Sequence, residues 1–364
     1  ELPLIETDIT SDYLTHFLGL CDEVRRLKVR TNAETPADAK RALSFGAEGI
    51  GLFRIEHMFY GEGSEEPLFH LQEMIMANSQ EERKTALDSL FPFMKNDIKE
   101  TLRTMEGLPV TIRLMDPPLH EFIPHDAKRQ KKLASALGIN AEELERRSDA
   151  LNESNPMMGH RGVRLGITHP EITEMQARAI LEAAAELSNE KVKTFPEIMI
   201  PLTGMETEYT HQENIVRKVA ENIDGLDNYM VGTMMEIPRA SFVADRIAET
   251  AEFFSFGTND LTQMAFGFSR DDTGGFMPAY LEQGLLPEDP FASLDEGVCE
   301  LVKMGIEKGR KTKSNLKVGI CGEHGGEPKS VHFCHGVGMD YVSCSPFRVP
   351  IARLSAAQAV LNEK

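Results

Sequence analysis

The sequence is short of positive charge. Its 39 Lys and Arg residues face 58 Asp and Glu residues, which gives a formal net charge of −19. This balance disfavours a broad surface for nucleic-acid backbones, so any anion site must be local. We therefore expect no nucleic-acid partner.

The chain also lacks an apolar run long enough to span a bilayer, and its first residues lack the charged, apolar and small-residue sections of a signal peptide. We expect no membrane partner. There is no initiator Met either, so we expect a processed product or a piece of a longer protein.

Cysteines are few and show no paired spacing. The five of them are odd in number and scattered along the chain. This pattern is typical of free thiols in a reducing cytoplasm rather than of a disulfide framework or a metal site. We expect packing roles for four of them, Cys21, Cys299, Cys334 and Cys344, and treat Cys321 separately.

Eight short apolar runs recur along the 364 residues, a length that suits either two domains or one large α/β barrel. The runs are near-continuously apolar, as strands covered on both faces are, and amphipathic segments separate them, which predicts a parallel sheet. They are residues 28–33, 49–54, 109–116, 197–202, 229–238, 253–260, 318–324 and 340–346.

A helix with clear start and stop signals follows the first run. Thr35 is a plausible N-cap, Pro36 occupies the first helical position, Asp38 the first turn, and Gly46 a plausible C-cap. Similar helical patterns occupy residues 207–222, 238–250 and 346–361.

Eight strand–helix units predict an α/β fold, a closed (β/α)₈ TIM barrel, with a doubly wound open sheet as the lesser alternative. Residues 1–364 would form a single domain in which residues 1–26 are an N-terminal lead-in.

Two gaps between strands are too long for one helix each, residues 55–108 and 117–196. We expect helical insertions after strands two and three, on the side where barrel loops build sites. The second gap contains the basic run KRQKK at 128–132, which we interpret as a solvated helix face rather than a binding patch.

Polar residues collect where the apolar runs end. In a parallel barrel all these ends lie at one face, where barrel enzymes keep their active sites. The residues are Asn32, Arg54, Arg113, Asp116, Glu236, Asn259, Asp260, Cys321, Glu323, His324, Ser343 and Ser345.

Two of these residues, Arg54 and Arg113, end consecutive strands. A guanidinium in such apolar surroundings needs an anionic partner, and phosphate oxygens match its geometry. The alternative is a pair of structural ion pairs, Arg54 with Glu56 and Arg113 with Asp116. Two arginines at neighbouring strand ends favour anion binding.

Two carboxylates, Glu236 and Asp260, close strands five and six. Mg²⁺ takes one or two carboxylates together with substrate oxygens, so this pair predicts a metal site. The alternative is an N-cap role for Asp260 and an indirect role for Glu236. Thr258 and Asn259 would supply neutral hydrogen-bond donors beside the metal.

A single cysteine, Cys321, ends strand seven between two glycines in GICGEHGGEP. With Glu323 and His324 adjacent, its thiol can donate or accept a proton if these neighbours tune its pKa. Buried cysteines usually serve packing alone, but the position at the mouth and the flanking glycines favour a chemical role for Cys321.

Several motifs, taken in the order in which they occur along the chain, closely resemble the C-terminal pyruvate/phosphoenolpyruvate (PEP) barrel of the pyruvate phosphate dikinase family of PEP-utilizing enzymes. They are GLFRIEHMF, TIRLMDPPLHEFIP, NPMMGHRGVRLGI, EIMIPL, GTMMEIPRA, FFSFGTNDLTQM and GICGEHGGEP. The resemblance runs from about Leu27 to Leu354. Related barrels occur in PEP synthase and in enzyme I of the sugar phosphotransferase system, but RLMDPPLHEFIP and GEHGGEP look more like the dikinase.

The resemblance implies a role for each matching residue. Cys321 would protonate the enolate methylene carbon when pyruvate forms. Ile55 stands where the family commonly has Thr, so any hydroxyl contribution is missing there. The remaining implied roles are phosphoryl clamps at Arg54 and Arg113, an anion contact at Arg161, Mg²⁺ ligands at Glu236 and Asp260, and contacts to substrate carboxylate and oxyanion at Gly257, Thr258 and Asn259.

The resemblance also implies partners. Whole dikinases have an ATP-binding domain and a swivelling domain with a phosphorylated histidine, and neither is recognisable here. We expect the chain to bind PEP or pyruvate with Mg²⁺, and to form a homodimer, without completing ATP-dependent turnover. The alternatives are a PEP synthase or enzyme I type of barrel, a carbon–carbon lyase that needs no phosphate clamp, and a catalytically silent dimerisation module.

Overall fold

Eight parallel strands close into a barrel in which β1 pairs with both β2 and β8. The structure is a computed structural model and describes residues 11–61, 63–124 and 126–363. The predicted TIM barrel is confirmed, and the open sheet is excluded. The strands are β1 (Lys28–Asn32), β2 (Ile50–Arg54), β3 (Pro109–Arg113), β4 (Phe195–Ile200), β5 (Met230–Met235), β6 (Phe253–Phe256), β7 (Lys317–Ile320) and β8 (Tyr341–Cys344).

Helices follow each strand and cover the barrel. In the first, Thr35 Oγ1 accepts from the backbone N–H of Asp38, and Gly46 just beyond the helix has φ +88°, as its sequence signals predict. The helices are α2 (Pro36–Ser44), α4 (Gln80–Thr104), α8 (Pro170–Asn189), α9 (Glu206–Ala220), α10 (Pro238–Phe242), α11 (Ala244–Ile247), α12 (Thr258–Phe266), α14 (Glu296–Thr312), α15 (Pro328–Gly336) and α16 (Val349–Leu361).

The predicted helix at 238–250 is in fact two short helices, α10 and α11. The break lies at Val243, whose backbone leaves helical geometry with φ −117° and ψ 20°. The N-terminal lead-in contains α1 (Asp12–Val24), which packs against α16, while residues 1–10 lie outside the described part.

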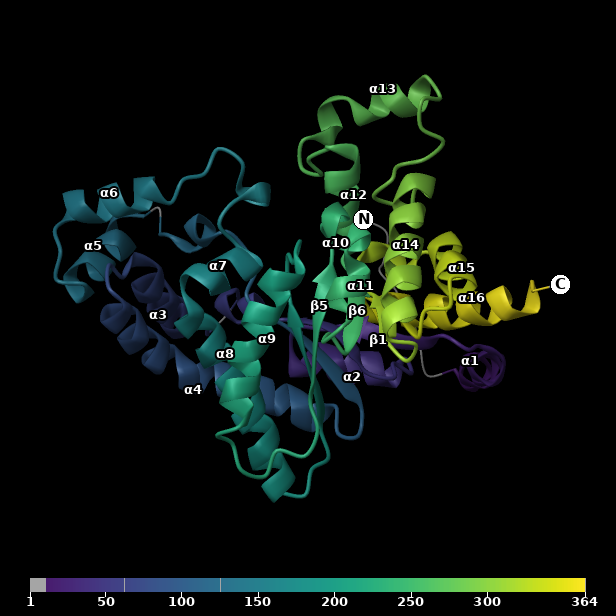
Figure 1. Cartoon of the computed structure of the whole chain (residues 1–364), viewed down its shortest axis with the longest axis horizontal. Coiled ribbons are helices and arrows are strands. Elements are labelled where there is room, and N and C mark those ends of the chain that lie inside the picture. Colours follow the sequence, from purple (N-terminus) through teal and green to yellow (C-terminus); the bar gives the residue numbers. More distant parts are fainter. Residues whose placement is uncertain (1–10, 62, 125, 364) are drawn as a thin grey trace.

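Extra helices occupy both predicted gaps. The run 128–132 lies on α5, and its four basic residues are exposed while Gln130 is half-buried, as expected of a solvated helix face. Figure 1 places α5 and α6 at the far left of the molecule, away from the barrel. The extra elements are η1 (Ile55–Phe59) and α3 (Glu65–Met76) after β2, and η2 (Leu119–Phe122), α5 (Ala127–Ala136), α6 (Ala141–Ala150), η3 (Pro156–Met158) and α7 (Gly162–Thr168) after β3.

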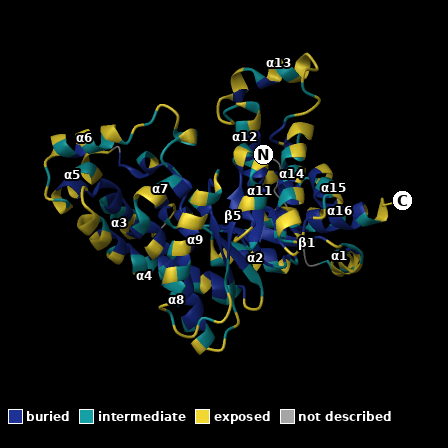
Figure 2. Cartoon of the chain, in the orientation of Figure 1, coloured by how far each residue is buried: buried dark blue, intermediate teal, exposed yellow. Residues whose placement is uncertain are grey.

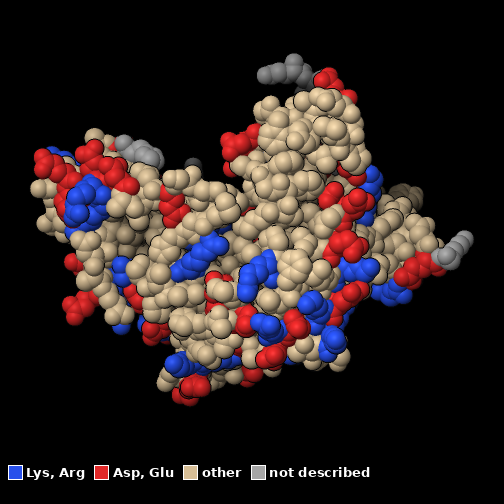
Figure 3. All heavy atoms as spheres, turned by 45° about the horizontal axis from the view of Figure 1, so that its top comes forward, with Lys and Arg blue, Asp and Glu red and all other residues tan. Residues whose placement is uncertain are grey.

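A third excursion, residues 267–295, separates α12 from α14 and was not predicted. It contains η4 (Thr273–Gly275) and α13 (Met277–Glu282), and α13 stands at the top of Figure 1. Figure 3 shows a notch between the α5–α6 lobe and the α13 lobe. The gap between the sixth and seventh predicted strands, residues 261–317, is longer than the first insertion at 55–108. This length was the signal in the sequence that could have predicted the excursion. The remaining short elements are η5 (Glu323–Gly326) and η6 (Pro346–Arg348).

The core surrounds the strands, whose residues are mostly buried (Figure 2). One large apolar cluster includes residues of the strands and of the helices that cover them. A small separate cluster contains Leu52, Met199, Met234, Phe253 and Cys321. All five cysteines are free, as expected. No helix in the described ranges combines the length and apolarity needed to cross a membrane.

Candidate active site

A cavity of about 910 Å³ opens at the carboxyl ends of the strands. It brings together most of the residues predicted from strand ends and motifs. Thr258 is buried and does not line the cavity. The strand-end residues Asn32, Glu323, His324, Ser343 and Ser345 do not line it either. The predicted residues that line it are Arg54, Arg113, Asp116, Arg161, Glu236, Gly257, Asn259, Asp260 and Cys321.

The two strand-end arginines are direct neighbours, because Arg54 of β2 lies opposite Arg113 of β3 in the parallel pairing. Arg54 forms an ion pair with Glu34, and Arg113 pairs with Glu56 and, at 3.1 Å, with Asp116. The alternative pairing of Arg113 with Asp116 is therefore present. The pairing of Arg54 with Glu56 is wrong, because the chain turns into η1 directly after Arg54 and Glu56 contacts Arg113 instead.

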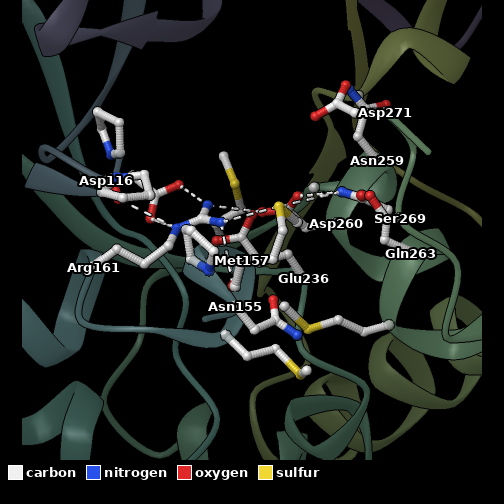
Figure 4. Close-up of a pocket in the computed structure, with 18 of the residues that line it drawn as sticks. Asp116, Asn155, Met157, Arg161, Glu236, Asn259, Asp260, Gln263, Ser269 and Asp271 are labelled. Atoms are coloured by element: carbon white, nitrogen blue, oxygen red, sulfur yellow. Dashed lines mark hydrogen bonds and ion pairs between the residues drawn. The ribbon is translucent and has the colours of Figure 1, made fainter. Parts of the chain in front are cut away.

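Three carboxylates meet at the centre of the cavity. Asp116, Glu236 and Asp260 each offer one oxygen, and these oxygens lie within 4.8 Å of one another. The guanidinium of Arg161 lies between two of them, with Nη2 2.5 Å from Asp116 and 3.0 Å from Asp260 (Figure 4). Asp116 is thus a third acidic group beside the predicted pair.

The charges around these carboxylates differ. Burial alone would raise the pKa of Asp116, but the guanidinium groups of Arg113 and Arg161 outweigh it and hold that pKa below its ordinary value. Burial, together with the charges of Asp116 and Asp260, raises the pKa of Glu236 well above its ordinary value. The protein therefore compensates the negative charge of Glu236 poorly, and a bound divalent cation would compensate it.

The backbone near Glu236 is held in an unusual conformation. Leu202 has φ +60°, which is rare for a leucine, and its N–H donates to Glu236 Oε1 at 2.6 Å. Beside it, a Cβ on Gly257 would come within 2.8 Å of Glu236 Oε2, so any larger residue there would push the Glu236 carboxylate out of place. Gly257 is also the N-cap of α12, which leaves Asp260 in the first turn and excludes the N-cap role considered for it.

Cys321 follows the last residue of β7 and is 2% exposed. Asn32 of β1 donates to its carbonyl oxygen at 3.0 Å and so fixes its backbone. Burial raises the pKa of Cys321 to about 11, and the charge of Glu236 adds to the rise, while the Ser255 hydroxyl and the charge of Arg54 oppose it. The group is accordingly a neutral thiol at neutral pH, suited to donating a proton.

The sequence neighbours of Cys321 do not tune it as expected. Glu323 turns outward to Arg270 at 2.6 Å. His324 is fully buried; its Nε2 donates to the carbonyl of Pro290 at 3.0 Å, so its Nδ1 accepts from the Thr258 hydroxyl at 2.7 Å. His324 therefore connects α12 to the end of the third excursion. Neither Glu323 nor His324 sets the pKa of the Cys321 thiol.

Comparison with known families identifies the barrel. Residues 10–361 match the family described as PEP-utilising enzyme, PEP-binding domain. The chain belongs to this family.

Similar proteins are pyruvate, phosphate dikinases. This PEP-binding domain is 56% identical over 366 residues to pyruvate, phosphate dikinase 1, chloroplastic, of Oryza sativa subsp. japonica, covering 99% of this chain and 38% of that protein. It is 54% identical over 349 residues to pyruvate, phosphate dikinase of Clostridium symbiosum, covering 94% of this chain and 40% of that protein. It is 52% identical over 368 residues to pyruvate, phosphate dikinase of Rhizobium meliloti (strain 1021), covering 100% of this chain and 40% of that protein. The chain thus spans about two fifths of these relatives.

Sequence reasoning missed several residues of this PEP-binding domain's cavity. Glu34 and Ser255 do not line it, but they act on Arg54 and Cys321, which do. Neither gave a local signal, because its partner comes from a different strand or strand end. Two loop segments line the cavity from opposite insertions, residues 154–158 before α7 and several of residues 267–272 after α12. The lengths of the gaps that contain them were the signal that could have found them.

Proposed function

We propose that this barrel, taken as one domain, performs the pyruvate/PEP half-reaction of a pyruvate phosphate dikinase. The observation that carries the proposal is one cavity lined by two neighbouring arginines, an acidic cluster and a buried thiol. Arg54 and Arg113 would bind the phosphoryl group, with Arg161 as a further anion contact. In support, Arg113 Nε is buried without a hydrogen-bond partner among the described residues, which leaves a donor for an anionic ligand.

Glu236 and Asp260 would hold Mg²⁺, and Gly257, Thr258 and Asn259 would contact the substrate's carboxylate and oxyanion. When bound there, the cation would stabilise negative charge that develops on the substrate's oxygen. The donor set fits a hard divalent ion, since it consists of carboxylate oxygens close enough to share one. Thr258 lies behind the residues that line the cavity, where its hydroxyl is bonded to His324.

Cys321 would move the proton. In the direction of pyruvate, the C2–C3 electron pair of the enolate takes the thiol proton, a C3–H bond forms, and the thiolate takes a proton from solvent. In reverse, the thiolate removes a C3 proton and the electron pair becomes the C2–C3 double bond. General acid–base groups of this kind typically contribute about 10²- to 10⁴-fold.

The partners of the full reaction would be a swivelling domain with a phosphohistidine and an ATP-binding domain, which the length of the relatives leaves room for. The isolated chain should not complete ATP-dependent turnover. We also propose a homodimer, to be tested by mass in solution. A cytoplasmic location fits the five free cysteines, and the chloroplast, which several relatives' names carry, is the alternative.

The test is exchange of solvent deuterium into the methyl group of pyruvate with Mg²⁺ present. The parent chain should exchange, and Cys321→Ala should slow exchange by about 10²- to 10⁴-fold. Cys344→Ala is the matched control, because Cys344 is an equally buried thiol at the end of β8 that does not line the cavity. Absence of exchange in the parent would support a silent dimerisation module.

A second arm separates the dikinase reaction from a lyase. Arg54→Ala should weaken PEP binding about 10- to 100-fold, the loss of a charged hydrogen bond, and pyruvate binding much less. The exposed Arg41 of α2 provides a control outside the cavity. If Arg54→Ala weakens the binding of neither PEP nor pyruvate, the result favours the lyase.

A further inference from the structure

The floor of the cavity is apolar around its one thiol. Five buried side chains form a separate cluster, and three of them, Leu52, Met234 and Cys321, also line the cavity. The other two, Met199 and Phe253, pack in the same cluster without lining it. The cavity thus meets a small apolar surface where the thiol lies.

Strand periodicity places this surface directly below the charged rim. Side chains two residues apart on a strand point to the same side, so Leu52 shares a side with Arg54 on β2, and Met234 shares one with Glu236, which directly follows β5. On two separate strands, therefore, an apolar side chain lies two residues before a charged group at the mouth and points to the same side. The cavity changes from charged to apolar with depth.

Pyruvate and PEP have the matching polarity. Their carboxylate and their oxygen on C2 need the charged rim, whereas C3 carries only hydrogen and gains from apolar contact. A substrate oriented in this way places C3 against Leu52 and Met234, next to the Cys321 thiol. The orientation that satisfies the charges is thus the one that the proton transfer needs.

The apolar floor has little room to yield. Leu52 is 3% exposed and Met234 is 2% exposed. A Cβ on Gly257 would lie 2.7 Å from Met234 Sδ, so Met234 is in close contact with the backbone on that side. An additional methyl group on C3 would have to displace one of these packed side chains.

We propose that Leu52 and Met234 are specificity-determining residues that limit the substrate's C3 to a methyl or methylene group and so exclude longer 2-oxo acids. This inference rests on the proposed function. A pocket that fits one carbon distinguishes a ligand with one more by about 10- to 200-fold. The parent should therefore exchange the C3 protons of 2-oxobutyrate that much more slowly than those of pyruvate.

The experiment measures deuterium exchange at C3 of pyruvate and of 2-oxobutyrate with the whole chain and Mg²⁺. The readout is the ratio of the two rates, which does not depend on how much of a variant is folded. Met234→Ala should shift the ratio at least about tenfold toward 2-oxobutyrate. Leu52→Val should shift it in the same direction, and this mild change keeps the test available if larger changes at Leu52 fail to fold.

Met199→Ala is the matched control, since it makes the same deletion in the same cluster away from the cavity lining. It should leave the ratio unchanged. An unchanged ratio in both Met234→Ala and Leu52→Val overturns the inference, and so does an equal shift in Met199→Ala, which would mean general loosening. Both outcomes leave the proposed function standing, whereas a parent that does not exchange pyruvate refutes that function and the inference with it.

Discussion

Replacing one glycine inside the barrel should strongly destabilise the protein. Gly319 of β7 lies against the ring of Tyr341 on β8, and a Cβ at this position would lie 2.2 Å from Cζ and 2.4 Å from both Cε atoms. The ring is 1% exposed and has Arg30 stacked over it at 4.0 Å from its centroid. It cannot withdraw without disturbing the buried ion pair of Arg30 with Glu197, at 2.8 Å.

The size of the effect follows from these contacts. Forcing an extra methyl group into a packed core typically costs about 1–3 kcal/mol. Because three ring atoms clash at once and the ring is held by a buried ion pair, we expect Gly319→Ala to lower the free energy of unfolding by about 3 kcal/mol. Exchange at pyruvate C3 should fall as well, since Cys321 is two residues further along from Gly319 and faces the same side.

Denaturant unfolding followed by circular dichroism measures the change in the free energy of unfolding. Gly336→Ala is the control, because no atom lies within 4 Å of its added Cβ; it should be neutral or stabilise by up to about 1 kcal/mol. Tyr341→Leu should partly rescue Gly319→Ala, so that the two changes are not additive. A Gly319→Ala variant within about 0.5 kcal/mol of the parent, or strict additivity with Tyr341→Leu, would refute this reasoning.

Two further predictions concern the half-buried Asp97 and the acidic cluster of the cavity. Burial raises the pKa of Asp97 on α4 from 3.8 to about 6, so the unfolded chain releases this proton at lower pH than the folded one, and stability falls as pH rises between these values. Asp97→Asn should therefore raise the free energy of unfolding above pH 6 by up to about 3 kcal/mol, with no gain below about pH 4, and an equal gain at both pH values would contradict this origin. For the acidic cluster, Mg²⁺ should raise the parent's melting temperature, by an amount equivalent to about 2.7 kcal/mol at a hundredfold excess over Kd, and Glu236→Gln should abolish the shift. Glu121→Gln, which alters a cavity-lining carboxylate outside the cluster, should retain the shift, and a parent without any shift would argue against the metal site.

The barrel could be read from the sequence because its signals are local. Strands buried on both faces leave continuous apolar runs, and the cap at Thr35 needs only its own neighbours. Local rules failed where packing overrides them. α4 continues through Pro92 to Thr104, although a proline inside a helix usually ends or kinks it. The third excursion carries no strong period, so it was missed despite its length.

The candidate site was predicted only as a set of strand ends. A parallel barrel brings its carboxyl ends to one face, so Arg54, Arg113, Glu236 and Cys321 could be expected to meet there. Of the contacts between these groups, the sequence suggested the ion pair of Arg113 with Asp116 but not the others. Glu56 contacts Arg113 rather than Arg54, because the turn after β2 decides where its side chain points.

The sequence by itself therefore determined the strands, their order and the end of the barrel at which chemistry-bearing residues gather. Tertiary structure alone decided the ion-pair partners of Arg54 and Glu56, the approach of Asp116 to the other two carboxylates, and the apolar surface beneath Cys321. The physical reason is that secondary structure depends on residues close in the chain. A carboxylate's partner and a thiol's pKa depend instead on strand register and turns, which bring together residues far apart in the sequence.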